Sequence, residues 1–247
     1  MPIIWVTGDT HGDWIHRVNM DSFPEQREMS KDDYVIILGD FGIWRDSPQQ
    51  RWYLNWLEEK HFTTLFIDGN HENYDILDSY PVEEWHGGKV HFIKPSIIHL
   101  MRGQVFEIDD LKFFTFGGAS SHDISDGVLE IDDPRVKEWR DDPDKMYRIN
   151  HISWWEREMP NQEEMDEGIK NLAEHNNKVD FILTHCTASS TAALLSHGLY
   201  RPDKLTNYLE EIRCNVDYKR WLCGHYHDNK AITIKDIVLY EQIVRIA

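Results

Sequence analysis

Two short motifs of metal-binding side chains stand near the two ends of the chain. Asp9-x-His11 lies close to the N-terminus, and His225-x-His227 lies close to the C-terminus. Residues at positions i and i+2 share one face of a strand, or curl around one ion where a strand ends. Either pair alone is weak, because such spacings occur by chance in many proteins. A metal site therefore needs further ligands from elsewhere in the sequence.

Ligands of this kind follow three other apolar runs. Asp40, Asn70-His71 and His185 each come directly after one of them. The polar segments together supply two carboxylates, one amide and five imidazoles, namely Asp9, His11, Asp40, Asn70, His71, His185, His225 and His227. Gathered without a cation, such groups would be buried and poorly satisfied. Imidazole and carboxylate suit Zn, Mn, Fe, Ni or Co, so the set predicts a pair of divalent cations whose identity stays open.

The runs that precede these polar residues predict buried strands. They are short, continuous and rich in β-branched or aromatic residues, which is typical of strands covered on both faces. Their ranges are 3–6, 34–38, 64–67, 181–183 and 221–223. Helical spacing of apolar residues lies between several of them, at 48–60, 161–176 and 203–213. Since ligands in α/β sheets bind beyond the carboxyl ends of the strands, the polar residues are expected to converge there.

Strand–helix alternation of this kind predicts a layered α/β fold. Shorter alternating runs predict hairpin or meander strands, which either extend the first sheet or form a second one facing it; their ranges are 90–93, 97–100, 104–108, 111–116, 230–234 and 237–244. The expected architecture is an α/β sandwich with mixed sheets.

Residues 119–160 fit this scheme least well. They contain three prolines and an aromatic cluster, formed by Trp139, Tyr147, Trp154 and Trp155. A loop of this length inside a compact domain is often functional. We expect a cap-like insertion that packs over one face through its tryptophans, and a surface elaboration without a role is the alternative.

Composition limits the class of protein. The chain has 247 residues with 26 Lys+Arg and 44 Asp+Glu, a net charge of −18. This balance argues against the extended basic surface of nucleic-acid binders and against binding to anionic membranes. No run reaches the roughly 18 apolar residues of a membrane span. Three scattered cysteines give no disulfide framework, so a reduced, cytoplasmic enzyme of one domain, with or without an insertion, is expected.

The ordered set of motifs resembles the calcineurin-like metallophosphoesterase family. The matching segments, spread over residues 3 to 227, are Asp9-x-His11, Gly39-Asp40, Gly69-Asn70-His71-Glu72, Thr184-His185 and Gly224-His225-x-His227. The resemblance implies a four-layer α/β/β/α sandwich with two mixed sheets, formed by a single domain over residues 1–247. It also implies a binuclear centre between the carboxyl ends of the strands.

The resemblance assigns roles residue by residue. It implies that one metal is held by Asp9, His11 and His227. It implies that Asn70, His185 and His225 hold the other metal, and that Asp40 bridges the two. His71 is similar to the family's histidine that faces the substrate without binding metal.

One departure from the family pattern bears on the substrate. Many members continue the Gly-Asp motif into a second Asp followed by Arg and Gly, whereas this chain continues as Gly39-Asp40-Phe41-Gly42-Ile43-Trp44-Arg45. The change argues against a protein Ser/Thr phosphatase. Arg45 is one candidate phosphate clamp, and a surface arginine packed on Trp44 is the alternative. The other candidate substrate-binding residues are His122, Arg148 and His151, and ordinary packing is the alternative for each.

The expected reaction is hydrolysis of a phosphate ester by attack of a hydroxide that bridges two divalent metals, such as manganese. Asp40 and His71 are the expected catalytic residues, with His71 donating a proton to the leaving oxygen or stabilising it. A small molecule or a nucleotide is the expected substrate. Phosphodiesterase and phosphomonoesterase activity both remain open, as does the oligomeric state. The alternatives are a catalytically silent metal-binding scaffold for protein interaction, and a zinc hydrolase that acts on a non-phosphate ester.

Overall fold

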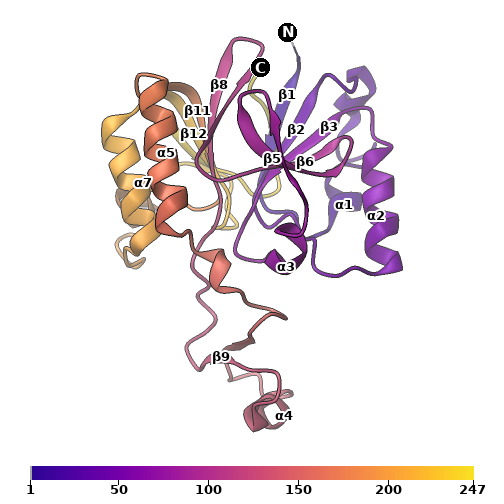
Figure 1. Ribbon diagram of the computed structural model, residues 1–247, viewed down its shortest axis with the longest axis vertical. Coiled ribbons are helices and arrows are strands. Elements are labelled where there is room, and N and C mark those ends of the chain that lie inside the picture. The colour runs from indigo at the N-terminus through magenta and orange to yellow at the C-terminus, as the bar shows by residue number, and fades with distance from the viewer. Residues whose placement is uncertain (1) are drawn as a thin grey trace.

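Two sheets face each other in the computed structural model, which describes residues 2–247. Helices cover the outer face of each sheet, so the order of layers is α/β/β/α (Figure 1). The four-layer sandwich with two mixed sheets is therefore confirmed. No helix within residues 2–247 combines the length and the apolarity that crossing a membrane requires.

The first sheet has seven strands in the order β15-β1-β2-β3-β6-β5-β4. Their bounds are Ile4–Thr7 for β1, Tyr34–Leu38 for β2, Thr63–Ile67 for β3, Val82–Trp85 for β4, Gly88–Lys94 for β5, Ile97–Leu100 for β6 and Ile243–Arg245 for β15. Strands β1, β2, β3 and β6 run parallel, and the outer strands are antiparallel. Every residue of β2 and β3 is buried, as expected for parallel strands covered on both faces.

The second sheet has six strands in the order β13-β14-β12-β11-β8-β7. Their bounds are Gln104–Ile108 for β7, Leu111–Phe116 for β8, Lys178–Thr184 for β11, Asp217–Cys223 for β12, Lys230–Ala231 for β13 and Asp236–Val238 for β14. Strands β8, β11, β12 and β14 run parallel, so β11 and β12 end at the same edge. The predicted strand at 237–244 is wrong as a single element. Its first part is β14 of this sheet and its last part is β15 of the other sheet, because the chain crosses between the sheets over residues 239–242.

Helices α1 (Trp14–Arg17), α2 (Pro48–Glu58) and α3 (Tyr74–Leu77) pack on the first sheet, and α5 (Gln162–Glu174), α6 (Ser189–Leu195) and α7 (Lys204–Asn215) pack on the second. Ser47 caps α2, because its side chain accepts a hydrogen bond from the Gln50 N–H. Asn161 and Glu164 form a capping box at the start of α5. The three predicted helices are thus present within a few residues of their expected bounds.

Successive residues of one strand contribute to different parts of the core. Ile36 of β2 belongs to the apolar cluster between the two sheets, and Val35 and Ile37 belong to the cluster under the helices of the first sheet. This follows from the two-residue period of a strand. The rigid sandwich that results fixes the ends of the strands, where the polar motifs stand.

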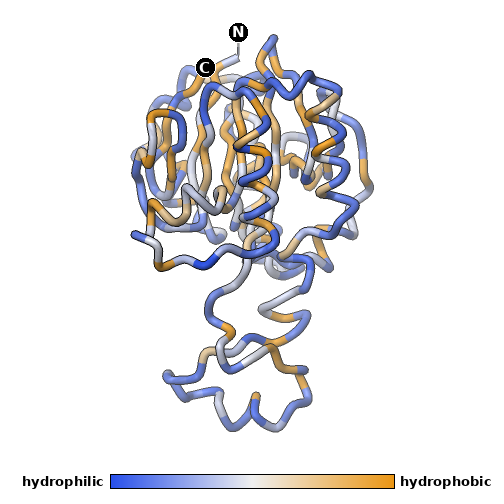
Figure 2. The backbone as a smooth tube through the Cα atoms, turned by 90° about the vertical axis from the view of Figure 1, so that its left-hand side faces the viewer, coloured by the Kyte–Doolittle hydropathy of each residue, from blue (hydrophilic) through white to orange (hydrophobic). Residues whose placement is uncertain are grey.

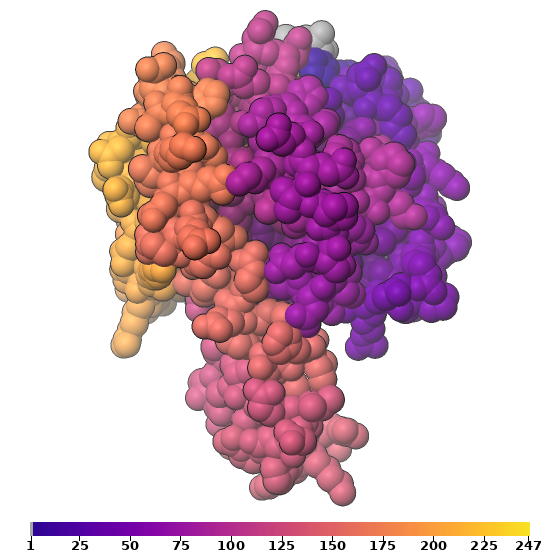
Figure 3. Space-filling model, viewed as in Figure 1, coloured from indigo at the N-terminus to yellow at the C-terminus, as the bar shows by residue number. Residues whose placement is uncertain are grey.

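Residues 119–160, called the arm below, project away from the sandwich (Figures 1 and 3). The arm contains β9 (Gly127–Leu129), α4 (Pro134–Trp139) and β10 (Tyr147–Ile149). Most of its residues are hydrophilic (Figure 2). Trp139 packs edge-on against Tyr147, with ring centroids 5.6 Å apart, so this tryptophan stays within the arm. Trp155 is buried in the cluster under the helices of the first sheet. The expectation that the tryptophans pack over one face therefore holds for Trp155 and is wrong for Trp139.

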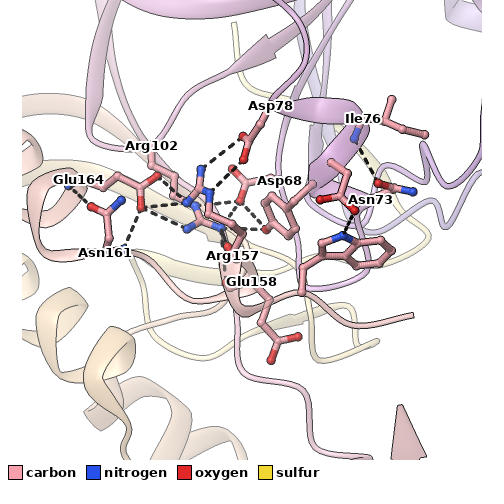
Figure 4. A network of polar contacts seen from close by, with 12 residues as sticks. Asp68, Asn73, Ile76, Asp78, Arg102, Arg157, Glu158, Asn161 and Glu164 are labelled. Carbon is pink, nitrogen blue, oxygen red and sulfur yellow. Dashed lines mark hydrogen bonds and ion pairs between the residues drawn. The ribbon is translucent and has the colours of Figure 1, made fainter. Parts of the chain in front are cut away.

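A buried polar network ties the base of the arm to the sandwich (Figure 4). Arg102, between β6 and β7, donates hydrogen bonds of 2.6 and 2.8 Å to Asp68, which follows β3. Arg157 of the arm contacts both Asp78 and Glu164. Burial acts to raise the pKa of the Asp68 carboxyl, but the Arg102 guanidinium holds that pKa well below its usual range. Asp68 is therefore a charged group that depends on one buried arginine.

Two histidines extend this network under the first sheet. His99 Nε2 lies 3.2 Å from Asp68 Oδ1, and His99 Nδ1 lies 3.1 Å from His91 Nδ1. Burial lowers the pKa of His91 to about 4, and His99 adds to the shift. In the unfolded chain, a histidine titrates near pH 6.5. The unfolded state therefore binds more protons than the folded state between about pH 6.5 and pH 4, and His91 destabilises the fold as the pH falls through this range.

We expect the free energy of unfolding to depend less on pH after a His91→Gln substitution. The loss of stability between pH 7 and pH 4.5 should be about 2 kcal/mol smaller in this variant, because glutamine does not titrate. Urea unfolding at both pH values, with a chelator present throughout, measures this difference. An exposed-histidine variant, His61→Gln, should retain the pH dependence of the original chain. Equal pH dependence in all three proteins would contradict the prediction.

Candidate metal centre

The candidate ligands stand on loops directly after β1, β2, β3, β11 and β12, so both sheets contribute to one site. Four of them have left-handed backbone, with φ values of 47° at His11, 45° at Asp40, 68° at His225 and 48° at His227. Non-glycine residues adopt this conformation at a cost on the order of 1–3 kcal/mol each, and only where the surroundings enforce it. Such a concentration of strained backbone marks a site where side-chain direction matters.

Close approach between the loops requires glycine beside the ligands. A Cβ atom on Gly39 would lie 2.1 Å from His185 Nδ1, and one on Gly69 would lie 2.0 Å from Asp40 Oδ1. Gly39 also has a φ of 92°. Any larger residue at these two positions would push the ligand-bearing loops apart.

Asp9, His11 and His227 form one group whose ligand atoms all lie within 4.8 Å of one another. The two imidazoles meet at 3.1 Å between their Nε2 atoms, and His227 Nε2 lies 3.3 Å from Asp9 Oδ2. Burial acts to raise the pKa of Asp9, but His185 and the contacts with His227 and His225 lower it. Asp9 is thus a buried carboxylate that faces several nitrogen ligands.

Asp9 also belongs to a second, fully buried group with Asp40 and His185, again within 4.8 Å. Asp40 Oδ1 lies 3.5 Å from His185 Nε2, and Asp40 Oδ2 lies 3.7 Å from His11 Nδ1. The two oxygens of Asp40 therefore face nitrogen atoms that belong to different groups. Asp40 Oδ1 also accepts a hydrogen bond of 2.7 Å from the His71 backbone N–H, which joins the loops after β2 and β3.

His185 is held in one tautomer by the backbone. Its Nδ1–H donates a 2.8 Å hydrogen bond to the Leu38 carbonyl, so the Nε2 of the neutral ring carries a lone pair. Asn70 Oδ1 lies 3.1 Å from that Nε2. Burial acts to lower the pKa of His185, but the carboxylates of Asp40 and Asp9 raise it. The two carboxylates thus make the surroundings of His185 Nε2 favourable for a positive charge.

A hydrogen-bond chain from the arm orients the Asn70 amide. Asn70 Nδ2 donates to Ser121 Oγ at 3.3 Å, and Ser121 Oγ donates to Glu158 at 2.6 Å. The Ser121 backbone N–H donates to the same carboxylate at 2.9 Å. Because the amide nitrogen is occupied in this way, the amide oxygen points towards His185. Burial raises the pKa of Glu158, in line with its position beneath the arm.

The remaining histidines lie around these groups. The ring of His225 packs edge-on against His185, with centroids 5.0 Å apart, and its Nε2 lies 3.3 Å from the Nε2 of His122. Burial lowers the pKa of His225 well below its usual range, and His185 adds to the shift. His71 lies 5.8 Å from His11 between ring centroids. Burial also lowers the pKa of His71, although Asp40 opposes this shift.

The predicted substrate-binding residues divide into three sets. Arg45 and Arg148 line one pocket together with His11 and His71. His122 stands beside His225. The third is His151, which contacts Asp75 at 2.9 Å and does not line that pocket. The structure thus places two of these four residues on a pocket next to the candidate centre, and their roles stay predictions.

A sequence profile of calcineurin-like phosphoesterases matches residues 3–229. The chain belongs to the calcineurin-like phosphoesterase family. This confirms the resemblance drawn from the motifs, and it indicates a metal-dependent phosphoesterase that acts on phosphate esters. No relative was found among curated proteins. Among solved structures, the phosphopantetheinyl hydrolase from Mycobacterium tuberculosis is similar with 14% sequence identity and a TM-score of 0.48, over 97% of this chain and 90% of that chain.

The donor set of this phosphoesterase fits divalent cations. When the His185 ring is neutral, its Nε2 and Asn70 Oδ1 present two lone pairs to each other at 3.1 Å, which is unfavourable without a cation or a proton near them. Two buried carboxylates stand beside them, and carboxylate, imidazole and amide oxygen together suit first-row divalent metals. The number and identity of the ions stay predictions.

Sequence reasoning about this phosphoesterase missed the groups that orient the ligands. The Leu38 carbonyl that fixes His185 is a backbone atom, which no motif reveals. Ser121 and Glu158 lie 37 positions apart and meet only because the arm returns to its starting point. Glu72 follows His71 in the motif Gly69-Asn70-His71-Glu72, and within residues 2–247 it makes no hydrogen bond with the ligand histidines. Its carboxylate instead accepts hydrogen bonds from the backbone N–H groups of Phe41 and Gly42 at 2.5 and 3.1 Å, and so holds the loop that carries Asp40.

Proposed function

We propose that this chain hydrolyses a phosphate ester at a centre of two divalent cations, held by Asp9, His11, Asp40, Asn70, His185, His225 and His227. The observation that carries the proposal is the pair of ligand groups that share Asp9 at the carboxyl ends of strands from both sheets. In this assignment Asp9, His11 and His227 would hold one cation. Asn70, His185 and His225 would hold the other, and Asp40 would serve both because its oxygens face both groups.

Two divalent cations would supply a water molecule with a lowered pKa and would neutralise the phosphoryl oxygens of the ester. The chain's own groups do the rest. Leu38 and Ser121 fix the directions in which His185 and Asn70 present their lone pairs. Glu72 fixes the loop of Asp40. Burial of these groups keeps the ligands in place before substrate arrives, which preorganises the site.

We propose that His71 stabilises the leaving oxygen of the ester. Its backbone is fixed by Asp40, and its ring faces the pocket that Arg45 and Arg148 also line. A His71→Ala variant should keep its bound metal and lose about 10²- to 10⁴-fold in turnover. The loss should be larger for phenyl esters than for p-nitrophenyl esters, because p-nitrophenolate leaves without help. The matched variant His61→Ala, at an exposed histidine, should turn over normally, and unchanged turnover in His71→Ala would remove this role.

We also propose that residues 1–247 form a single domain in which the arm is an insertion. Trp155 packs into the core under the first sheet, and Arg157 joins the buried network at the base of the arm. A cytoplasmic location and manganese as the working metal are part of the same proposal. They rest on the scattered free cysteines and on the ligand types.

Hydrolysis of bis-p-nitrophenyl phosphate and of p-nitrophenyl phosphate tests the proposed function. The protein is stripped of metal, reconstituted with manganese and assayed on both esters and on p-nitrophenyl acetate. We expect turnover of a phosphate ester only after reconstitution, and the preferred compound separates a diesterase from a monoesterase. Turnover of the acetate alone would favour a carboxylic-ester hydrolase. Two bound metals without any turnover would favour a silent scaffold.

A further inference from the structure

A pocket of about 410 Å³ opens beside His11 and His71, between the sandwich and the arm. Trp44 and Arg45, from the loop after β2, line one side. Arg148 and Ile152 of the arm line it as well, so the arm forms one of its walls. It reaches the candidate metal centre at His11, which makes it a place for the organic part of a substrate.

The indole of Trp44 is held in a fixed orientation although 42% of the residue is exposed. Its Nε1–H donates a 2.9 Å hydrogen bond to the His71 carbonyl, and its own carbonyl accepts one of 3.0 Å from Asn73. Trp44 also lies against Gly12, where an added Cβ would be 3.5 Å from the indole ring. An exposed tryptophan tied to its surroundings in this way offers a preorganised flat surface next to His71.

The arm contributes a second apolar surface. Ile152 is 49% exposed and lines the pocket, with Trp155 at its base. Large side chains left open to solvent in a cavity next to a candidate active site are typical of ligand recognition. The two apolar walls therefore suit an organic group with a large apolar surface.

Charge in the pocket is unevenly compensated. Arg148 forms an ion pair with Asp123 of the arm, so its charge is neutralised locally. Arg45 has no ion-pair partner within residues 2–247 and stands beside Trp44. Among residues 2–247, the pocket therefore offers one cation without an ion-pair partner and one fixed aromatic face, and aromatic rings stack favourably on both indole and guanidinium groups.

We propose that this pocket selects phosphate esters whose organic group is a planar aromatic ring, with Trp44 as the stacking surface and the arm as the opposite wall. The proposal rests on the phosphoesterase function proposed above. It places the phosphoryl group at the metal centre and the ring against Trp44. An alkyl group of equal volume would fill the cavity but would not stack.

Non-hydrolysable phosphonates test this selectivity without requiring turnover. Phenylphosphonate, cyclohexylphosphonate and methylphosphonate share one head group, and the first two are of similar size. Calorimetric titration of the manganese-loaded protein should give a roughly five- to tenfold preference for the phenyl compound over the cyclohexyl compound, in line with aromatic pairing. Trp44→Ala should remove that preference, so that the phenyl and cyclohexyl compounds bind this variant with equal affinity. Trp44→Phe should keep most of the preference, and Trp52→Ala, at an exposed tryptophan outside the pocket, should keep all of it.

The outcomes separate this inference from the proposed function. Binding of the phenyl and cyclohexyl compounds with equal affinity would overturn the aromatic selectivity and leave the phosphoesterase proposal intact. If Trp44→Ala weakened the binding of all three phosphonates equally, Trp44 would stabilise the metal centre and would not recognise the organic group. That result would also overturn the aromatic selectivity. No binding of any phosphonate to protein with measured bound metal would contradict both proposals together.

Discussion

Replacing Asp40 by asparagine is expected to lower phosphate-ester turnover by more than about 100-fold and to reduce the bound metal, since removing even an outer partner of a metal ligand costs 10- to 100-fold. Both Asp40 oxygens face nitrogen atoms, one towards His185 and one towards His11. Asparagine keeps one oxygen, which still accepts the His71 N–H, but its amide nitrogen carries no lone pair for a cation. The change therefore removes one connection between the two groups and one negative charge.

The backbone should tolerate this substitution. Asp40 has a φ of 45°, and asparagine adopts left-handed backbone as readily as aspartate does. Metal content by mass spectrometry and turnover on the preferred phosphate ester measure the effect. Asp21→Asn, at an exposed surface aspartate, is the matched control and should retain both. Full metal content with normal turnover in Asp40→Asn would show that Asp40 is no bridge.

Replacing Arg102 by methionine is expected to destabilise the fold by about 3–5 kcal/mol, the range found when one partner of a buried ion pair is removed. Arg102 and Asp68 are both buried, and the arginine also donates to Tyr74 and to the Arg157 carbonyl. Without it, Asp68 keeps its contacts with Tyr74 and His99 but loses its permanently charged partner under the base of the arm. A loss of this size is a large share of the 5–15 kcal/mol that folded proteins typically have.

Urea unfolding at pH 7 measures this loss, and two further variants locate its cause. The double variant Asp68→Asn with Arg102→Met should recover part of the stability, because no charge is then left buried. Arg135→Met breaks an exposed arginine–aspartate pair on the arm and should leave stability unchanged, since exposed pairs contribute little. If Arg102→Met were as stable as Arg135→Met, the buried pair would not hold the base of the arm.

Much of the sandwich was predictable because its signals are local. The run 34–38 is apolar at every position and becomes β2, buried throughout. Ser47 and Asn161 cap the helices that follow them. The ligand-bearing segments could be grouped because each follows a strand, and parallel strands end together. Local composition and one rule of topology were enough for these features.

Other features depend on contacts between distant segments. The pair of Asp68 and Arg102 joins residues 34 positions apart, and neither residue has a local signal for its partner. The crossing at 239–242 was missed although Glu241 and Gln242 interrupt the apolar run there, because the sequence does not show that the strands on either side join different sheets. The direction of the arm was also missed. Trp139 was expected to pack over one face with the other tryptophans, but it packs within the arm against Tyr147.

The two hydrogen bonds between Ser121 and Glu158 join the beginning and the end of the arm. Ser121 lies where the chain enters the arm, and Glu158 lies where the chain returns from it. Ser121 also accepts the hydrogen bond from the Asn70 amide. The segment between His122 and Trp155 can therefore change in length or sequence while these hydrogen bonds keep the Asn70 amide in place, because Trp155 and Arg157 hold the base of the arm on the sandwich. The outer part of the arm is therefore a segment that can be exchanged without disturbing the metal ligands. Grafting a different segment between 122 and 155 would reshape one wall of the pocket and leave the metal chemistry of the sandwich as it is.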